Sequence, residues 1–302
     1  MIAISTTWNY KEDCSMREML LAIKELGVND IELGYNFTIT RLEELLGLLD
    51  SVQMRVVSVH NFCPLPPQNP YHRFFINYYY LSSLDETERK LAVEYTKKTI
   101  DTAARLSAKI VIIHAGNIDM DTAKIKALMK LYCAGNSNSK EYDNLKTDIL
   151  KLREEKKILY LEATRKSLEE IMPYAASKDI KIGLENRYYP NEIPNLEEAQ
   201  KFLKSFANKS LVYWHDVGHS QALERLGFIA TGSLLNKLSK YLFGFHLHDI
   251  RGLHDHLAPF TGDFDFSKLN RYLKNDKILK VIEAHHPATA HDIKNAIKHL
   301  AL

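Results

Sequence analysis

The sequence predicts an α/β fold in which a single (β/α)8 barrel accounts for the chain. Eight short apolar runs alternate with segments of helical spacing along the 302 residues, an order typical of a parallel sheet. Eight such units are the number that closes a barrel. A doubly wound open sheet is the structural alternative, but it usually has a Gly-rich phosphate turn after its first strand. The corresponding stretch here, TTWNY (Thr6–Tyr10), contains no glycine.

The predicted strands are short and mostly rich in Ile, Val and Leu. In chain order they are Ile2–Ser5, Asp30–Leu33, Arg55–Val59, Lys109–Ile113, Ile180–Leu184, Leu211–Trp214, Phe243–Leu247 and Leu279–Ile282. Apolar residues at helical spacing predict the helices Ser15–Leu26, Arg41–Leu49, Asp85–Ser107, Leu145–Tyr174, Leu196–Phe206, Gly232–Lys240 and Ala288–Leu300. Ser15 and Gly27 are of the residue types that cap the two ends of a helix.

Two segments interrupt the even spacing. The first is a loop rich in proline and aromatic residues, from Asn61 to about Tyr80, and loops of this length usually form a lid or a substrate wall. The second is a helical insertion over about 117–165, divided by GNSNS (Gly135–Ser139). Because no linker-like composition flanks this insertion, residues 1–302 are expected to form one domain.

Bulk composition indicates an ordinary globular protein. The formal charge of +2 does not favour nucleic acid as a partner, and the three cysteines lack the spacing of a metal site or a disulfide framework. No apolar stretch approaches the length needed to cross a membrane, and the N-terminus lacks the basic region of a signal peptide. We therefore expect a cytoplasmic protein without a membrane partner.

Histidines and carboxylates recur where the predicted strands end. The most informative run is LVYWHDVGH (Leu211–His219), in which an apolar strand ends at an Asp-x-x-His pair. In a barrel, the carboxyl ends of the strands form the active face, so these side chains would converge. The residues are Glu32, His60, His114, Glu185, Asp216, His219, His246 and Glu283, with His254 and His256 on the loop after the seventh strand. Ligands of this type suit Mn²⁺, Co²⁺, Fe²⁺ or Zn²⁺ better than Mg²⁺.

Five motifs resemble the xylose isomerase-like TIM barrel superfamily over nearly the whole chain. They are GLEN (Gly183–Asn186), HDVGH (His215–His219), FHLHD (Phe245–Asp249), HDHLAPFTGDFDF (His254–Phe266) and IEAHHP (Ile282–Pro287). The superfamily contains sugar isomerases and epimerases as well as AP endonuclease family 2, the endonuclease IV type of abasic-site nuclease. The resemblance is weakest in the 61–80 loop and in the insertion.

The resemblance to the isomerase and epimerase branch implies one divalent metal held by four residues. The matching positions are Glu185, Asp216, His246 and Glu283. The metal would polarise a ketose carbonyl and hydroxyl, and Glu185 and Glu283 would remove and return the proton of the neighbouring carbon. This is the function we expect: a metal-dependent isomerase or epimerase of sugar metabolism.

Further residues would bind the substrate, a small sugar or sugar phosphate. His219 would contact a substrate oxygen, Arg187 a hydroxyl or a phosphate, and Trp8 could cover a sugar ring. His248 is either a substrate contact or a donor behind the metal ligands, because it lies on the same strand face as His246. The identity of the sugar, its phosphorylation and the formation of a homo-oligomer are left open.

The alternative function is that of a multinuclear zinc AP endonuclease or phosphodiester hydrolase. That branch also uses histidines that match His60, His114, His219 and His256, and it has an aspartate where this chain has His254. The near-neutral charge counts against it, because nuclease affinity comes largely from phosphate contacts. The long 61–80 loop after the first of these histidines also counts against it. A barrel that binds a metal or ligand without turnover is the third interpretation.

Overall fold

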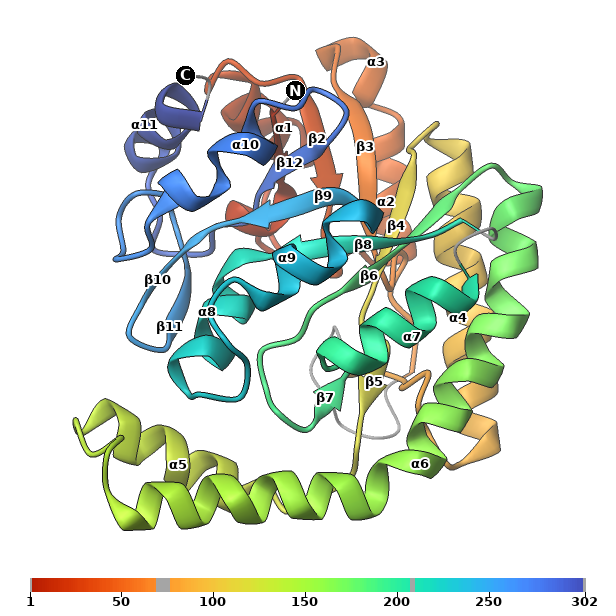
Figure 1. The fold of residues 1–302 in the computed structure, drawn as a ribbon. Coiled ribbons are helices and arrows are strands. Elements are labelled where there is room, and N and C mark those ends of the chain that lie inside the picture. The colour runs from red at the N-terminus through yellow and green to blue at the C-terminus, as the bar shows by residue number, and fades with distance from the viewer. Residues whose placement is uncertain (1, 69–76, 207–209, 301–302) are drawn as a thin grey trace.

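The computed structural model describes residues 2–68, 77–206 and 210–300. Eight parallel strands close into a barrel in the order β1-β12-β9-β8-β6-β4-β3-β2 (Figure 1). Their bounds are β1 (Ile2–Ser5), β2 (Asp30–Leu33), β3 (Arg55–His60), β4 (Ile110–Ile113), β6 (Lys181–Glu185), β8 (Leu211–Asp216), β9 (Leu242–Leu247) and β12 (Leu279–Ile282). The predicted (β/α)8 barrel is confirmed, and every predicted strand is present with ends that agree to within two residues.

Helices surround the barrel, as Figure 1 shows. They are α1 (Met16–Lys24), α2 (Ile39–Leu46), α3 (Leu49–Val52), α4 (Glu86–Arg105), α7 (Leu196–Phe206), α8 (Val217–Arg225), α9 (Ser233–Leu238), α10 (Asn270–Leu273) and α11 (Ala290–Leu300). Ser15 caps α1 as predicted, since its hydroxyl accepts a hydrogen bond from the Glu18 amide at 3.3 Å. No helix among the described residues is long and apolar enough to cross a membrane.

Helix α8 was not expected from the sequence. It begins directly after β8, because the Asp216 carboxylate caps it and accepts the His219 amide at 2.7 Å. Gly218 lies in the first turn of this helix, against the His248 ring. The strand therefore passes into a helix without a loop.

The insertion after β4 consists of β5 (Gly116–Asn117), α5 (Ala123–Cys133) and the first half of α6 (Lys140–Ser177). Its helical character and its break near GNSNS agree with the prediction, although α6 begins earlier because Ser139 caps it. The first half of α6 packs on α5 through Tyr142 and Ile149. The second half returns to the barrel beside α4 (Figure 1). There Arg89 pairs with Glu170 at 2.8 Å.

The polar segment after β9 forms an antiparallel hairpin of β10 (Asp249–Arg251) and β11 (His254–Leu257), although the sequence predicted only a loop there. The buried Asp249 carboxylate accepts the amides of Gly262 and Phe264, at 2.8 and 3.0 Å. A further short strand, β7 (Glu192–Ile193), pairs with β5. Of the predicted 61–80 loop, residues 69–76 lie outside the described residues.

The barrel interior is closed by apolar side chains below the polar mouth. Trp214 is fully buried there with Ala3, Ile110, Ile112 and Val281. Its indole fills the space beside Gly244 on β9, where any β-carbon would lie 2.1 Å from the ring. The Trp214 ring also packs edge-on against His246, with the ring centroids 5.2 Å apart. The polar side chains lie beyond this apolar layer, at the carboxyl end of the strands.

Candidate metal centre

Three groups of side chains at the barrel mouth have the composition and spacing of metal ligands. The first combines Glu185, Asp216, His246 and Glu283; the second combines His60, His114 and Glu185; the third combines His219, Asp255 and His256. Within each group, one candidate ligand atom from every residue lies within 4.8 Å of the others. We call them the central group, the β3–β4 group and the hairpin group.

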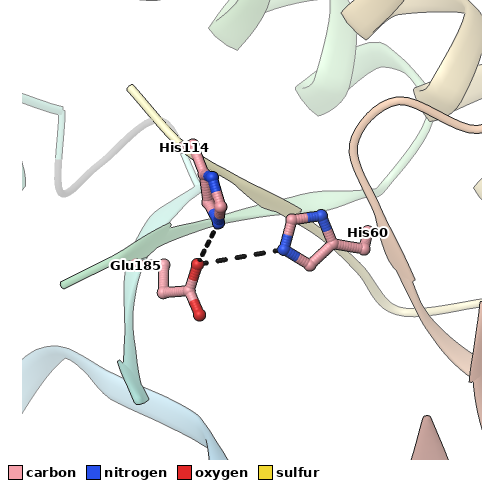
Figure 2. A group of neighbouring side chains, drawn as sticks. All are labelled: His60, His114 and Glu185. Carbon is pink, nitrogen blue, oxygen red and sulfur yellow. Dashed lines mark ion pairs between the residues drawn. The ribbon is translucent and has the colours of Figure 1, made fainter. Parts of the chain in front are cut away.

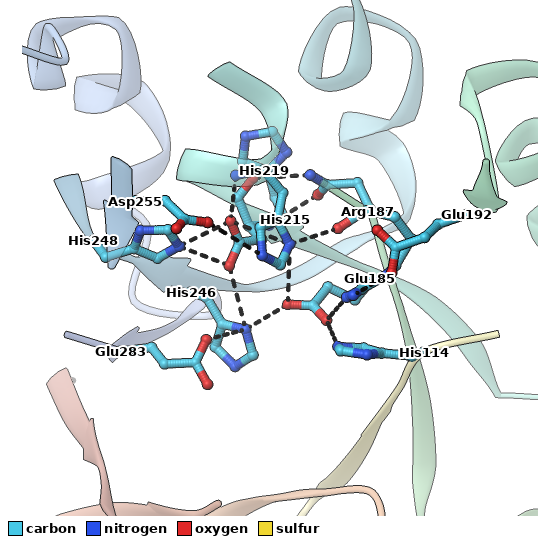
Figure 3. A network of polar contacts seen from close by, with 12 residues as sticks. His114, Glu185, Arg187, Glu192, His215, His219, His246, His248, Asp255 and Glu283 are labelled. Carbon is cyan, nitrogen blue, oxygen red and sulfur yellow. Dashed lines mark hydrogen bonds and ion pairs between the residues drawn. The ribbon is translucent and has the colours of Figure 1, made fainter. Parts of the chain in front are cut away.

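The central group contains the four residues predicted to hold the metal. Each comes from the end of a neighbouring strand, and all four are buried. The Nδ1 atom of His246 lies 2.7 Å from Glu185 Oε1, 3.1 Å from Glu283 Oε2 and 3.8 Å from Asp216 Oδ2 (Figure 3). The structure therefore brings together the four side chains that the sequence predicted as ligands.

The electrostatics of the central group favour a bound cation. Burial raises the pKa of the Glu283 carboxyl to about 7, and the nearby charges of Glu32 and Glu185 add to this while His246 opposes it. Burial also disfavours ionised Glu185, but its contacts with His114 and His246 hold the pKa of this carboxyl well below its usual value. Carboxylates this crowded need positive charge nearby, and a divalent ion supplies it.

The β3–β4 group shares Glu185 with the central group. The second carboxylate oxygen of Glu185, Oε2, lies 2.6 Å from His114 Nε2 and 3.8 Å from His60 Nε2 (Figure 2). The Nδ1–H of His60 donates to the backbone oxygen of Asn61 at 2.9 Å, which leaves Nε2 to face the carboxylate. Glu185 can therefore bridge the two groups, one oxygen to each.

The hairpin group is built in the same manner. His219 donates its Nδ1–H to the Asn186 carbonyl at 3.1 Å, and His256 donates its own to the Glu283 carbonyl at 3.0 Å. Both Nε2 atoms lie 3.8 Å from the same oxygen of Asp255. Backbone carbonyls thus fix the tautomer of both rings, and the unprotonated nitrogens converge on one carboxylate.

A cavity of about 440 Å³ opens on these groups. Its wall includes Glu185 and Glu283 and members of the other two groups, together with the aromatic side chains of Tyr35, Tyr188 and Tyr189. Arg187 also lines it, as predicted, but is buried between two carboxylates: NH1 donates to Glu185 at 2.9 Å and NH2 to Glu192 at 2.8 Å. Aromatic side chains and buried charged side chains thus line the same cavity.

Trp8, His248 and His254 were predicted for the site but lie neither in this cavity wall nor in the three groups. Trp8 donates its indole N–H to the Ala288 carbonyl at 2.9 Å and packs against the core. His248 is fully buried behind the site, with Nε2 at 2.9 Å from both oxygens of Asp216 (Figure 3). His254 is exposed on the hairpin and belongs to none of the three groups.

Two residues that support the site were missed by the sequence reasoning. Asp255, the central residue of the HDH run, takes the place expected for His254, and an acidic residue between two histidines was the available signal. Asn186 of GLEN fixes Asp216 through two hydrogen bonds, accepting its amide at 2.8 Å and donating to its carbonyl at 2.9 Å. No sequence signal distinguished this role.

The fold and the site define a (β/α)8 barrel with candidate metal ligands at the carboxyl end of its strands. The family comparison is consistent with this class: the model of the xylose isomerase-like TIM barrel matches residues 20–301. The chain belongs to that family. No curated protein matches the sequence.

Solved structures share the fold at low identity. A D-tagatose 3-epimerase-like protein is 19% identical with a TM-score of 0.65, and the match covers 99% of this chain and 96% of that one. A 3-keto-D-glucoside 4-epimerase from E. coli is 13% identical with a TM-score of 0.66, covering 99% and 98%. A Thermus thermophilus protein, soaked with ZnCl2, is 20% identical with a TM-score of 0.59, covering 99% and 95%. At these identities the likeness establishes the fold alone.

Proposed function

We propose that this protein is a divalent-metal-dependent isomerase or epimerase acting on a sugar or a sugar phosphate. The observation that carries the proposal is the central group, in which Glu185 and Glu283 are both candidate ligands and cavity-lining side chains. The epimerases among the structural neighbours support the same direction.

The residues fit a divalent cation of the Mn²⁺, Co²⁺ or Zn²⁺ type. The central group offers three carboxylates and one imidazole, and no thiolate is present in any of the three groups. When bound, such a cation would supply Lewis acidity to a substrate carbonyl and so make the adjacent C–H more acidic.

The side chains of the cavity would carry out the proton transfer. Glu185 and Glu283 approach the cavity from different strands, so one can remove a proton from the substrate carbon while the other returns it. His219 and Arg187 would hold substrate oxygens, and Tyr35, Tyr188 and Tyr189 would cover the C–H faces of a sugar. A volume of about 440 Å³ suits a small molecule better than a polymer.

Exchange of a substrate C–H with solvent tests this function directly. Protein purified without chelator is incubated with ketoses and ketose phosphates in D2O, and deuterium incorporation is measured by mass spectrometry. Glu185→Gln and Glu283→Gln should each abolish incorporation, whereas Glu88→Gln should retain it, because Glu88 is a buried carboxylate bonded to Tyr80 and Ser83. Undiminished exchange in the two cavity variants would refute the assigned roles.

A multinuclear zinc phosphodiester hydrolase is the second candidate. One observation favours it: the β3–β4 and hairpin groups adjoin the central group, and Glu185 belongs to two of the three. Metal ions held by such neighbouring groups could activate water and stabilise a leaving oxygen.

Metal stoichiometry separates the two candidates. About one Mn, Co or Fe per chain would favour the sugar reaction, whereas two or three Zn per chain would favour the hydrolase. Incision of DNA containing an abasic site is then the activity to measure. Asp255→Asn should weaken that incision, because Asp255 is the only carboxylate of the hairpin group.

A further inference from the structure

Glu32 is a buried carboxylate that the proposed reaction does not use. It lies on β2 with none of its surface exposed, and it takes no part in the three candidate metal groups. Its Oε1 atom accepts the Nε2–H of His246 at 2.9 Å. Its Oε2 atom accepts the hydroxyl of Ser58 at 2.7 Å, from the neighbouring strand. A carboxyl group at this depth requires hydrogen-bond partners, because burial of a polar group without them is costly.

The position of Glu32 relative to the His246 ring is the informative feature. Nδ1 of that ring faces Glu185 and Glu283, whereas Nε2 faces Glu32 on the opposite side. An imidazole coordinates a metal through an unprotonated nitrogen, and its other nitrogen then carries the proton. A carboxylate fixed at Nε2 keeps the proton there and raises the basicity of Nδ1.

Ser58 completes the arrangement. Ser58 is fully buried, and it lies opposite Glu32 in the parallel register of β2 and β3. By occupying Oε2, its hydroxyl fixes the rotation of the carboxylate, so that Oε1 stays in line with Nε2. The contact between Trp214 and His246 restrains the same ring from a third direction.

We infer that Glu32, held by Ser58, is a positioning residue that fixes the tautomer and orientation of His246, so that Nδ1 is offered to the metal of the central group. This inference rests on the metal site of the proposed function. It extends that site to two residues on β2 and β3, away from the cavity.

Glu32→Gln is the critical substitution. The amide oxygen is a weaker acceptor than a carboxylate, and in the other orientation the amide NH2 would donate to Nε2 and move the imidazole proton to Nδ1. Either orientation weakens coordination. We expect the affinity of one metal ion to fall by about 10- to 100-fold, with any other bound ion unaffected. Ser58→Ala should act in the same direction with a smaller loss.

The measurement is metal affinity by chelator competition, combined with the increase in melting temperature that the metal produces. Neither readout depends on a substrate. Glu88→Gln is the matched control, because it makes the same change at another buried carboxylate that accepts hydrogen bonds from a backbone amide and a serine hydroxyl. A merely structural role for Glu32 would lower the melting temperature equally with and without metal. A positioning role would instead make the increase in melting temperature produced by the metal smaller in Glu32→Gln than in the wild type.

Imidazole ¹⁵N spectra of the zinc-loaded protein provide a second readout, with His246→Asn to assign the signal. The wild-type ring should carry its proton on Nε2. Unchanged metal affinity and an unchanged His246 signal in Glu32→Gln would overturn the inference while leaving the proposed function in place. A wild-type protein that binds no divalent metal would overturn both. If Glu32→Gln does not fold, the metal affinity of Ser58→Ala tests the inference. An affinity equal to that of the wild type would then overturn it.

Discussion

Gly218→Ala should destabilise the protein, although the same change inside a helix is normally favourable. Gly218 lies in the first turn of α8, where an alanine would usually add about 0.5–1 kcal/mol of stability. A β-carbon at this position would lie 2.2 Å from Cε1 and 2.7 Å from Nδ1 of His248. Ordinary contacts begin near 3.4 Å, so the ring would have to move by about 1.2 Å.

The size of the effect follows from what that movement disrupts. His248 is fully buried, lies 2.9 Å from both Asp216 oxygens, and accepts the His256 amide at 2.9 Å. Overpacking of a rigid interior costs about 1–3 kcal/mol, and a hydrogen bond to a charged group contributes about 1.5–3 kcal/mol. We expect a net loss of about 2–5 kcal/mol, a large fraction of the 5–15 kcal/mol typical of a folded protein.

Urea unfolding of the metal-free protein measures this loss, because the absence of metal removes any contribution from ion binding. Gly47→Ala is the control: it changes a glycine at the end of α2 whose φ is −64° and whose β-carbon would meet nothing closer than 3.6 Å. That variant should be as stable as the wild type or slightly more stable. A Gly218→Ala protein whose stability is within about 0.5 kcal/mol of the wild type would contradict the expected clash with the His248 ring.

Three further predictions concern charge and metal binding. Metal affinity should increase with pH through about 7, because the pKa of the Glu283 carboxyl is raised to about 7 and that of the His246 ring is raised as well, so that a cation must displace protons from both. Isothermal titration across a range of about pH 5–9 checks this, and a flat profile would contradict it. Arg153→Met should lower the free energy of unfolding by about 3–5 kcal/mol, because it removes the guanidinium that lies 2.6 Å from the buried Glu198 carboxylate. Urea unfolding measures this loss, and the double variant Arg153→Met/Glu198→Gln should recover part of the stability. Removal of metal by a chelator should lower the melting temperature, and excess Mn²⁺ or Zn²⁺ should restore it, with a gain of about 2.7 kcal/mol at a concentration about 100 times Kd; an unchanged melting temperature would argue against a metal centre.

The barrel and the central group could be predicted from the sequence because both depend on repetition. Each apolar run marks a strand, and each polar residue after a run lies at the same end of the barrel once the strands are parallel. Glu185, Asp216 and Glu283 follow this rule directly. For His246 the motif FHLHD was needed as well, because alternation alone places His248 on the same face.

The hairpin group shows where such reasoning fails. Side-chain alternation along a strand would place His254 and His256 on one face and Asp255 on the other. In the structure His256 has a φ of 53°, in the left-handed region, and Asp255 and His256 both turn toward His219 while His254 is exposed. A histidine with positive φ is uncommon, and sequence periodicity gives no sign of it. The local backbone, not the residue type, decided which member of HDH reaches the site.

The supporting contacts of the centre were also beyond prediction, since they join residues that are distant in the sequence. Asn186 connects β6 to Asp216, and Glu32 reaches His246 across the barrel interior. Such contacts depend on strand closure and on the depth of each side chain, which the spacing of motifs does not give. They nonetheless determine which nitrogen of each histidine is free to bind a metal.

Charge at the mouth links these contacts to the choice between the two candidate functions. Glu185, Asp216 and Glu283 are buried together, and the only buried guanidinium lining the described part of the cavity, that of Arg187, is already paired with Glu185 and Glu192. Additional negative charge on a substrate would therefore be tolerated only if cations occupied the site. A single ion at the central group would suit a neutral sugar, or a sugar phosphate whose phosphate lies away from these carboxylates. A phosphate placed against the carboxylates would require ions at the neighbouring groups as well. The number of metals bound per chain thus bears on the charge of the substrate group held there, not only on the type of reaction.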